Sequence, residues 1–555
     1  MSRRAGWFGA LAGMACAALA IGTAEAVAVL TGSRSAPLVA VGGAVVDLAP
    51  APLKQFATDV FYVHDKIALL AGTAVLLGGF AALVGVVATR SLRLGTAGIA
   101  LFGLLGAAAA LTRPGAGPAT ALPSLVGAGL AAGLLWLLIA GPLSIPAAGP
   151  SAIPPAGPSG IPPADPSGIS PGDRPKIPVI KGSESRHADD TPAKLPDHGD
   201  LGGRRGFLRG VGGALGVAVV TGFGGRWVST RRGVAEARSA VRLPAPASPA
   251  PPLPAGADLA LPGLAPYVTP NRDFYRIDTA LVVPQVDPAG WSLRIHGRVR
   301  NPITLTFADL LARPMVERHI TLACVSNEVG GDLIGTARWL GVPLGPLLAE
   351  ADPLDGADQV VARSADGWTC GSPTAVLRDG RDAILAVGMN GSPLPVEHGF
   401  PVRVVVPGLY GYVSACKWVV ELELTSFADF DAYWVPRGWS ARGPIKTQSR
   451  IDTPRAGRAV TAGPVTVAGV AWAQHVGIRR VEVRLDDGEW QPATLAATAS
   501  SDTWVQWSWR WAATPGEHTL RVRAMDATGA VQTGESRPVD PDGATGWHTM
   551  RVNVR

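Results

Sequence analysis

The stretch that decides the fold reads ITLACVSNEVGGDLIGTARWLGVPL and covers residues 320–344. It opens with the apolar, β-branched run ITLA, which predicts a short buried strand. Cys324 stands where this run ends, and Asn327, Gly330 and Gly331 behind it suit an irregular loop that approaches a ligand closely. A soft thiolate at such a place is a reasonable ligand for a transition metal. A lone cysteine is more often a small buried hydrophobic residue, so its position alone leaves both interpretations open.

Further segments in a fixed order surround Cys324. They read TPNRDFY (269–275), TARWLGVPL (336–344), MNGSPLPVEHGFPVRVVVPG (389–408) and YGYVSACKW (410–418). Together with the cysteine they resemble the molybdopterin-binding domain of the sulfite oxidase family, over roughly the second half of the chain. The resemblance implies a molybdopterin-dependent oxidoreductase in which Cys324 is the protein ligand of a molybdenum ion.

The resemblance also implies which residues hold the molybdopterin. A pterin carries a phosphate and hydrogen-bonding ring edges, which proteins meet with arginine, lysine, histidine and hydroxyl donors. Arg403 and Lys417 each lie in a strongly apolar run, where a charge needs a partner such as a bound phosphate. Beyond the aromatic pair of TPNRDFY the family often has an arginine and a histidine, whereas this chain has Arg276 and Ile277. The expected cofactor contacts are Asn271, Phe274, Tyr275, Arg276, His398, Arg403, Ser414 and Lys417.

The choice of substrate follows less directly. Sulfite-oxidising members place an arginine a few residues after the metal cysteine, as anion binding requires, but this loop carries Glu328. Arg338 would supply one positive charge, or else contact the pterin or solvent. Tyr433 lies near the position at which the family has an active-site tyrosine, where it would donate a hydrogen bond or relay a proton. The expected substrate is sulfite, a small S-oxide or N-oxide, or oxidised methionine in a protein. Electrons would pass to or from an external carrier (a quinone or a cytochrome), because the sequence has no haem-attachment or iron–sulfur motif.

Composition excludes several other classes of protein. The net charge is +6, the arginines are spread along the chain, and no basic patch is interleaved with aromatic residues, so nucleic acid is not an expected partner. The sequence has neither GxGxxG after a strand nor GxxxxGK, which disfavours NAD and ATP. Besides Cys324 the chain has Cys16, Cys370 and Cys416, whose wide spacing suggests neither disulfides nor a zinc site. We expect Cys370 and Cys416 in the core.

The N-terminal part reads as a membrane region. Four apolar runs at residues 5–30, 67–88, 97–111 and 122–145 predict transmembrane spans. The run 36–46 is too short to span, and it is expected either to lie at the outer interface or to re-enter the membrane. Arginines flank the first span and lie in the second short loop, which places the N-terminus inside. His64 is the only histidine of this region, so a haem relay is not expected. An anchor or partner-docking bundle is the preferred interpretation over a quinone-facing redox module.

The segment RRGFLR at residues 204–209 precedes a Gly/Ala-rich apolar stretch. This resembles a twin-arginine export signal, although it lies in mid-chain and has Gly203 where serine or threonine is frequent. The alternative is a basic flank that holds a fifth membrane helix. Both interpretations place the second half of the chain on the extracytoplasmic face of the cell membrane, as part of a multi-pass protein.

From residue 459 onward the hydrophobic pattern has a period of two, with Trp507, Trp509 and Trp511 on one face, and Asp487-Gly488 is typical of a hairpin turn. This predicts an immunoglobulin-like β-sandwich in which the tryptophans form the core, and the resemblance implies that it mediates a homodimer. Before it, WSLRIHGRV (291–299) predicts a strand with His296 on its solvated side, and the mixture of elements has no βαβ rhythm, so the class is α+β.

The sequence thus predicts a helical bundle, an α+β molybdopterin domain and a β-sandwich. The expected divisions are transmembrane helices (1–146), a Pro/Gly-rich linker (147–203), the twin-arginine-like span (204–228), a second linker (229–262), the catalytic domain (263–442) and the Ig-like domain (443–555). A non-catalytic extracytoplasmic module with a vestigial pterin pocket is the alternative function.

Overall fold

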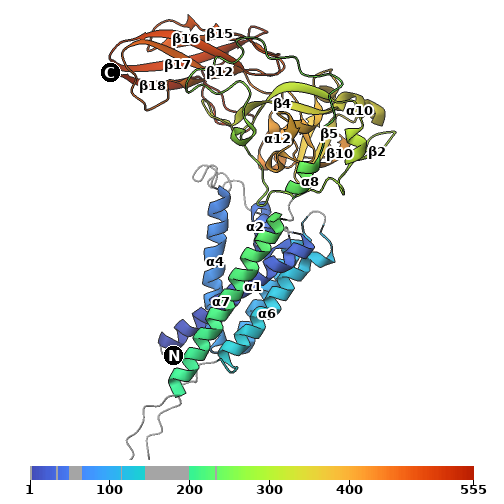
Figure 1. The fold of residues 1–555 in the computed structure, drawn as a ribbon, viewed down its shortest axis with the longest axis vertical. Coiled ribbons are helices and arrows are strands. Elements are labelled where there is room, and N and C mark those ends of the chain that lie inside the picture. Colours follow the sequence, from blue (N-terminus) through green and yellow to red (C-terminus); the bar gives the residue numbers. More distant parts are fainter. Residues whose placement is uncertain (1–2, 33–34, 49–64, 114–115, 144–198, 232–233) are drawn as a thin grey trace, which may run out of the picture.

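The computed structural model describes the chain except for residues 1–2, 33–34, 49–64, 114–115, 144–198 and 232–233. Most of the expected first linker and His64 lie outside the described residues. The N-terminal part forms a bundle of long helices, and two β-rich bodies lie together beyond one end of this bundle (Figure 1). The chain passes between the two parts through one long helix and the segment that follows it.

The bundle contains five described helices that are long and apolar enough to cross a membrane, judged by length and composition. The helices are α1 (Arg3–Thr31), α4 (Asp65–Ala88), α5 (Leu92–Leu111), α6 (Leu122–Ile139) and α7 (Gly199–Arg231), with the shorter α2 (Pro37–Leu48) between the first two. Helix α5 is longer than the predicted run 97–111, because its N-terminus is capped by Ser91, whose side chain accepts from the Leu94 backbone N–H.

Small residues bring the bundle helices close together. A Cβ at Gly13 of α1 would lie 1.9 Å from the Ala81 carbonyl oxygen of α4, so this crossing requires glycine. In α7, Phe207 of the RRGFLR segment is buried and packs edge-on against Phe8 at 5.4 Å. Large apolar side chains cover the outside, including Val75 and Phe223 at 74% exposure each. A helix bundle with an apolar exterior suits a lipid environment.

The region expected to be the catalytic domain, together with the segment packed on it, is called the catalytic half below, and it is built on two sheets. One has the order β2-β1-β10-β5-β6, and the other has the order β3-β4-β7-β8 with β9 also pairing β7. The strands are β1 (Ser292–Gly297), β2 (Ile303–Thr306), β3 (Val316–Ala323), β4 (Ile334–Pro343), β5 (Gln359–Ser364), β6 (Thr369–Pro373), β7 (Ile384–Met389), β8 (Ser392–Pro393), β9 (Arg403–Val405) and β10 (Val419–Thr425). Short helices α9 (Phe307–Leu311), α10 (Leu344–Ala351), α11 (Thr374–Leu377) and α12 (Gly411–Ser414) lie between them. The predicted α+β class and the predicted strands before Cys324 and around His296 are confirmed.

The segment expected as a second linker is instead packed along the catalytic half. Within it, α8 (Ala235–Ala240) carries Arg238, which donates to the carbonyls of Leu394 and Pro393 at 2.6 Å each. Further on, Ser248 forms a parallel bridge with Val316 at the free edge of β3. An extended Pro/Ala segment has little core of its own, but its backbone groups satisfy an exposed strand edge.

The C-terminal domain is a sandwich of two four-stranded sheets, β11-β12-β16-β15 and β14-β13-β17-β18. Its strands are β11 (Gln448–Thr453), β12 (Gly463–Trp472), β13 (Ile478–Leu485), β14 (Gln491–Pro492), β15 (Thr494–Leu495), β16 (Val505–Ala513), β17 (Gly516–Asp526) and β18 (His548–Val554). Trp507 and Trp511 are buried in its core, as expected. Gln506 alternates with these tryptophans on β16 and is nevertheless fully buried, where it bonds the backbone of Leu259 and Ala265.

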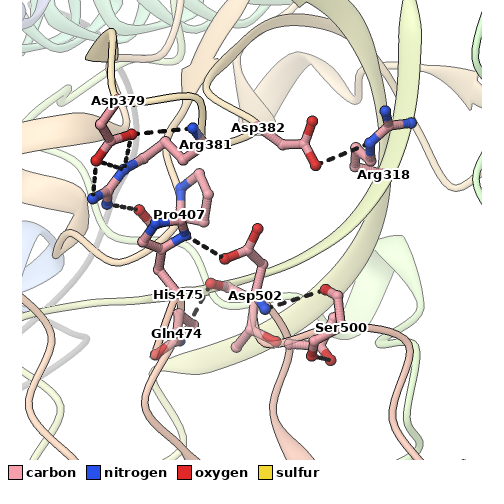
Figure 2. A network of polar contacts seen from close by, with 11 residues as sticks. Arg318, Asp379, Arg381, Asp382, Pro407, Gln474, His475, Ser500 and Asp502 are labelled. Atoms are coloured by element: carbon pink, nitrogen blue, oxygen red, sulfur yellow. Dashed lines mark hydrogen bonds and ion pairs between the residues drawn. The ribbon is translucent and has the colours of Figure 1, made fainter. Parts of the chain in front are cut away.

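The two β-rich bodies meet through polar contacts. Figure 2 shows the His475 imidazole against Asp502, 3.1 Å apart, with Arg381 and Asp379 of the catalytic half beside them. Arg381 also donates to the Pro407 carbonyl at 2.7 Å. This contact region lies at the edge strand β3 that leads to Cys324, since Asp502 accepts from the Thr321 backbone N–H.

Candidate functional site

Cys324 follows the last residue of β3 and is buried. Its backbone N–H donates to the Leu333 carbonyl at 2.9 Å, which closes residues 324–333 into a loop. Burial raises the pKa of the Cys324 thiol, while hydrogen bonds from Ser326 and the charge of Lys417 oppose that rise. A thiol with donors and a cation beside it is prepared to act as a thiolate when a metal is bound.

Arg403 is the most unusual charge of the site. It is buried at the start of β9, donates to the His398 carbonyl at 3.2 Å, and lies over the Trp339 ring with 5.0 Å between the guanidinium carbon and the ring centre. Within the described part of the chain no carboxylate pairs with it, and burial lowers its pKa to about 10. A buried guanidinium without an acid is suited to an anionic ligand.

His398 lies next to this guanidinium and is fully buried. Its Nε2 is 3.1 Å from the Asn271 carbonyl oxygen, whereas its Nδ1 is buried without a hydrogen-bond partner among the described atoms. Burial, helped by the charges of Arg403 and Lys417, lowers its pKa to about 4, so the imidazole is neutral at ordinary pH. An orphaned ring nitrogen here points to a missing polar ligand.

Lys417 supplies a second buried cation. Its ammonium lies 3.0 Å from Asp278, which also pairs with Arg276 at 2.8 Å. Burial lowers the pKa of Lys417 to about 8, and the attraction of Asp278 opposes this shift. Gly399, at φ +110°, lets the 398–403 loop approach Lys417, since a Cβ there would lie 3.1 Å from the lysine Cα. Two cations thus share one carboxylate.

Aromatic rings form the wall beneath these charges. Phe274 stacks on Tyr275 at 5.2 Å and meets His398 edge-on at 5.6 Å. Burial and the neighbouring Cys324 raise the pKa of Tyr275, so its hydroxyl remains a hydrogen-bond donor. Asn271 holds the wall to the loop after β7, donating to the Met389 carbonyl at 3.3 Å.

The structure does not bring every expected residue to Cys324. Arg338 neighbours Trp339 on β4 and therefore points to the opposite face, where it pairs with Glu317 at 3.3 Å. The hydroxyl of Ser414 donates to the carbonyls of Leu409 and Tyr410, which makes it a brace for α12. Both assignments arose from sequence position, which does not state where a side chain points.

Tyr433 lies in the loop beyond β10. Its backbone N–H donates to Thr369 Oγ1 at 3.0 Å, and its ring packs under the Arg437 guanidinium at 3.7 Å and against Trp434 at 5.2 Å. Thr369 begins β6, in the sheet other than that of β3. These contacts hold Tyr433 between β6 and Arg437, and its role in catalysis stays a prediction.

The structure adds two residues that the sequence did not single out. Asp278 pairs with Lys417, and Tyr410 is a buried phenol whose pKa is raised to about 12 by burial together with Asp542 and Cys324. Tyr410 belongs to the segment 410–418, which offered a signal for it. Asp278 had no such signal. Glu328 is exposed, so the acid that argued against sulfite faces solvent.

A separate cluster of possible metal ligands lies on the first sheet. His296, Glu421 and Glu423 have ligand atoms within 4.8 Å of one another. Arg294 and Arg363 pair with Glu421 at 2.9 and 3.3 Å, so the acids are already neutralised. This is an ion-pair network on a half-exposed strand face.

The residues around Cys324 fit a phosphorylated pterin. Arg403 lacks an acid, His398 has an orphaned nitrogen, and Gly399 leaves no space for a side chain where the loop meets Lys417. Each feature matches what an anionic, hydrogen-bonding ligand requires, and the thiol of Cys324, which is near Lys417, is a suitable ligand for its metal.

Comparison with known proteins agrees with this fit. The model of the oxidoreductase molybdopterin binding domain matches residues 280–434, and that of a bacterial Ig domain matches residues 448–522. Mitochondrial sulfite oxidase of Mus musculus is 31% identical over 52% of this chain and 62% of its own length. Sulfite oxidase of Gallus gallus is 30% identical over 51% of this chain and 72% of its own.

Among solved structures, the sulfane dehydrogenase SoxCD from Paracoccus pantotrophus is 26% identical, with a TM-score of 0.46, over 53% of this chain and 85% of that chain. The match to the mouse enzyme leaves more than a third of that enzyme uncovered. The match to the chicken enzyme covers more than two thirds of it, and both recognised domains occur here in sequence. The chain therefore belongs to the sulfite oxidase family of molybdopterin-dependent oxidoreductases.

Proposed function

We propose that this chain is a membrane-anchored molybdenum–pterin oxidoreductase that transfers an oxygen atom to or from a small substrate. The observation that carries the proposal is the buried Arg403 guanidinium, which has no acid partner among the described residues and lies close to His398 and to Lys417, the cation near Cys324. Burying such a charge without a counter-ion is unfavourable, so packing of the core alone does not account for it.

The chain's own residues would hold the cofactor and exclude water from it. Arg403, Lys417 and the Nδ1 of His398 would bind its phosphate and ring edges, and Cys324 would ligate the metal. When bound, the molybdenum centre supplies the two-electron chemistry of oxygen-atom transfer. Tyr275 stays protonated beside Cys324 and would donate a hydrogen bond towards the reacting group.

The substrate class and electron partner belong to this proposal too. Oxidation with water as the oxygen source releases two protons and two electrons, and reduction of an S-oxide or N-oxide consumes them. Outside the proposed cofactor contacts, the cations that the described residues place around the Cys324 loop are already paired with acids, Arg450 with Asp452 at 2.6 Å and Lys446 with Asp542 at 2.7 Å. A neutral S-oxide or N-oxide is therefore favoured over sulfite. A quinone or cytochrome would exchange the electrons.

The test is the molybdenum and pterin content of the full-length chain, made with its cofactor pathway and compared with Cys324→Ser. Near-stoichiometric metal in the parent, with turnover lost in the variant, is the expected result. A parent without metal or pterin would instead favour the non-catalytic module. A substrate screen of sulfite against S-oxides and N-oxides then separates the substrate classes.

A further inference from the structure

The loop that carries Cys324 is contacted by residues of the C-terminal domain as well as by its own domain. The loop spans residues 324–333, and its base is closed by the Cys324 N–H to Leu333 carbonyl bond and by the Leu333 N–H to Asn327 Oδ1 bond at 2.8 Å. These two bonds fix the ends of the loop. The middle of the loop, around Gly330, contacts the C-terminal domain instead.

Arg450 of β11 makes the first of these contacts. Its Nη1 donates to the Gly331 carbonyl oxygen at 2.7 Å, while its Nε and Nη2 bind Asp452 at 2.6 and 3.3 Å. Both side chains are nearly buried, with exposed fractions of 10% and 8%. The ion pair therefore fixes the guanidinium, and the remaining Nη1 is directed at the loop.

His548 of β18 makes the second contact. A Cβ placed on Gly330, whose φ is +80°, would lie 2.4 Å from the imidazole Cδ2, so the ring packs directly on the loop backbone. The ring is itself held, because its Nδ1 accepts from the Ile451 backbone N–H at 3.0 Å. Gly546 of the same domain lies close to Val329, with 3.6 Å from its Cβ position to a valine methyl.

The strand before the loop depends on the same domain. Thr321 makes three hydrogen bonds to this domain. Its backbone N–H donates to the Asp502 carbonyl, and the Thr321 carbonyl accepts from Gln474 Nε2 at 3.2 Å. The Thr321 hydroxyl accepts from the backbone N–H of Trp504 at 2.8 Å. Gln474 and Asp502 belong to the network in Figure 2. The C-terminal domain thus holds both the approach to Cys324 and the far side of its loop.

We propose that Arg450 and His548 are positioning residues for Cys324, which fix its loop in the geometry that metal ligation requires. This inference rests on the proposed function, in which Cys324 is the metal ligand. It assigns the Ig-like domain a part in the catalytic site. Reaction rates respond steeply to small displacements of a reacting group, so a loosened loop should slow turnover without abolishing cofactor binding.

The first experiment needs no metal. Full-length protein made without cofactor is treated with an alkylating reagent, and the rate at Cys324 is followed by peptide mass spectrometry, with Cys370 and Cys416 as internal references. The variant pair Arg450→Met with Asp452→Asn removes the bond to Gly331 without leaving a buried charge. We expect alkylation of Cys324 at least about ten-fold faster, with the references unchanged, from the loss of a charge-assisted bond.

The matched control is Arg523→Met with Glu482→Gln. This pair also joins an arginine of the C-terminal domain to an acid of the same domain, at 2.8 Å, and its hydrogen bonds within the described residues do not reach the loop. It should leave the Cys324 rate within about two-fold of the parent, inside the usual effect of a surface ion pair. Equal rates in the parent and the Arg450 pair would overturn the inference.

A double-mutant cycle covers the case in which the Arg450 pair fails to fold. Gly330→Ala introduces a methyl group against the His548 ring, at a φ of +80° that also strains alanine, and should speed alkylation. Adding His548→Ala makes room for the methyl group but leaves the strain, so the double variant should react more slowly than the product of the two single effects. Independent effects of the two substitutions would contradict the contact.

In loaded enzyme the same variants should keep their molybdenum, show an altered thiolate-to-metal absorption band, and have kcat about 10- to 100-fold lower at unchanged KM. A parent without molybdenum would refute the proposed function alone, because the alkylation result does not depend on the metal.

Discussion

Arg403 and Lys417 are charged side chains inside apolar runs, and for this reason both could be recognised as unusual from the sequence alone. Their context predicts that each needs a partner, and the structure supplies Asp278 to Lys417 alone. That Asp278 takes this part is not readable from the sequence, because the two residues are 139 positions apart. Nor does the sequence say that Arg338 faces away from the site, since the face of a strand residue depends on its register.

Arg403→Met should separate stability from cofactor binding. In cofactor-free protein the unfolding free energy should stay the same or rise by about 1–2 kcal/mol, because removing an unpaired buried charge offsets the loss of the contact with Trp339 and of the hydrogen bond to the His398 carbonyl. Cofactor retention should fall by about 10- to 100-fold. Chemical denaturation and pterin fluorescence measure the two. Arg381→Met, which leaves Asp379 unpaired, is the control and should only destabilise.

His398 predicts a pH dependence of the cofactor-free protein. Its pKa is about 4 when folded, below the ordinary value of 6.5, so the unfolded chain takes up the proton first as the pH falls. Stability should therefore decline from pH 6.5 towards pH 4 by up to about 3 kcal/mol and be unaffected by this group above pH 7. Denaturation of the parent and His398→Gln across this range tests it. Parallel curves would show that His398 does not titrate in this way.

Among the elements, β3 depends most on its surroundings. The apolar run ITLA predicted its last four residues, but the strand begins at Val316, where half-exposed polar residues gave no such pattern. It is the edge of its sheet, and its free side is covered by Ser248 and by the C-terminal domain. A strand edge that is covered by a segment distant in the sequence depends on tertiary contacts, which a local sequence pattern does not predict.

Thr321→Val tests this coverage. The substitution removes the hydroxyl that accepts from the Trp504 N–H and leaves that buried donor without a partner. The unfolding free energy should drop by about 1–3 kcal/mol. Thr336→Val is a matched control, because Thr336 bonds the same hydroxyl but not Trp504, and it should cost less. Equal losses in the two variants, measured by denaturant unfolding, would mean that the Trp504 bond is not the important one.

At the scale of the whole molecule, composition predicts the kinds of structure in the chain better than the segments that join them. Apolar runs predicted the long helices, and the two-residue period predicted the sandwich, because both patterns are local. The joint after α7 was expected to be a linker, yet Val234 is buried beside Phe274 and Arg238 binds the loop that contains Leu394. A Pro/Ala-rich composition does not show what the segment docks against.

This joint determines how the catalytic half can be released. If the helices anchor the protein, the full chain should remain with the membrane fraction after washing at high pH, whereas a chain lacking residues 1–231 should be soluble and still bind pterin, because it keeps α8 and its contacts with Leu394 and Pro393. Removing residues 1–262 should give a less stable protein, since Val234, Arg238 and the Ser248 bridge are lost together. Fractionation, pterin fluorescence and thermal unfolding compare the three chains. A full chain that appears in the soluble fraction would refute the anchor, and equal stability of the two shortened chains would show that the docked segment contributes nothing.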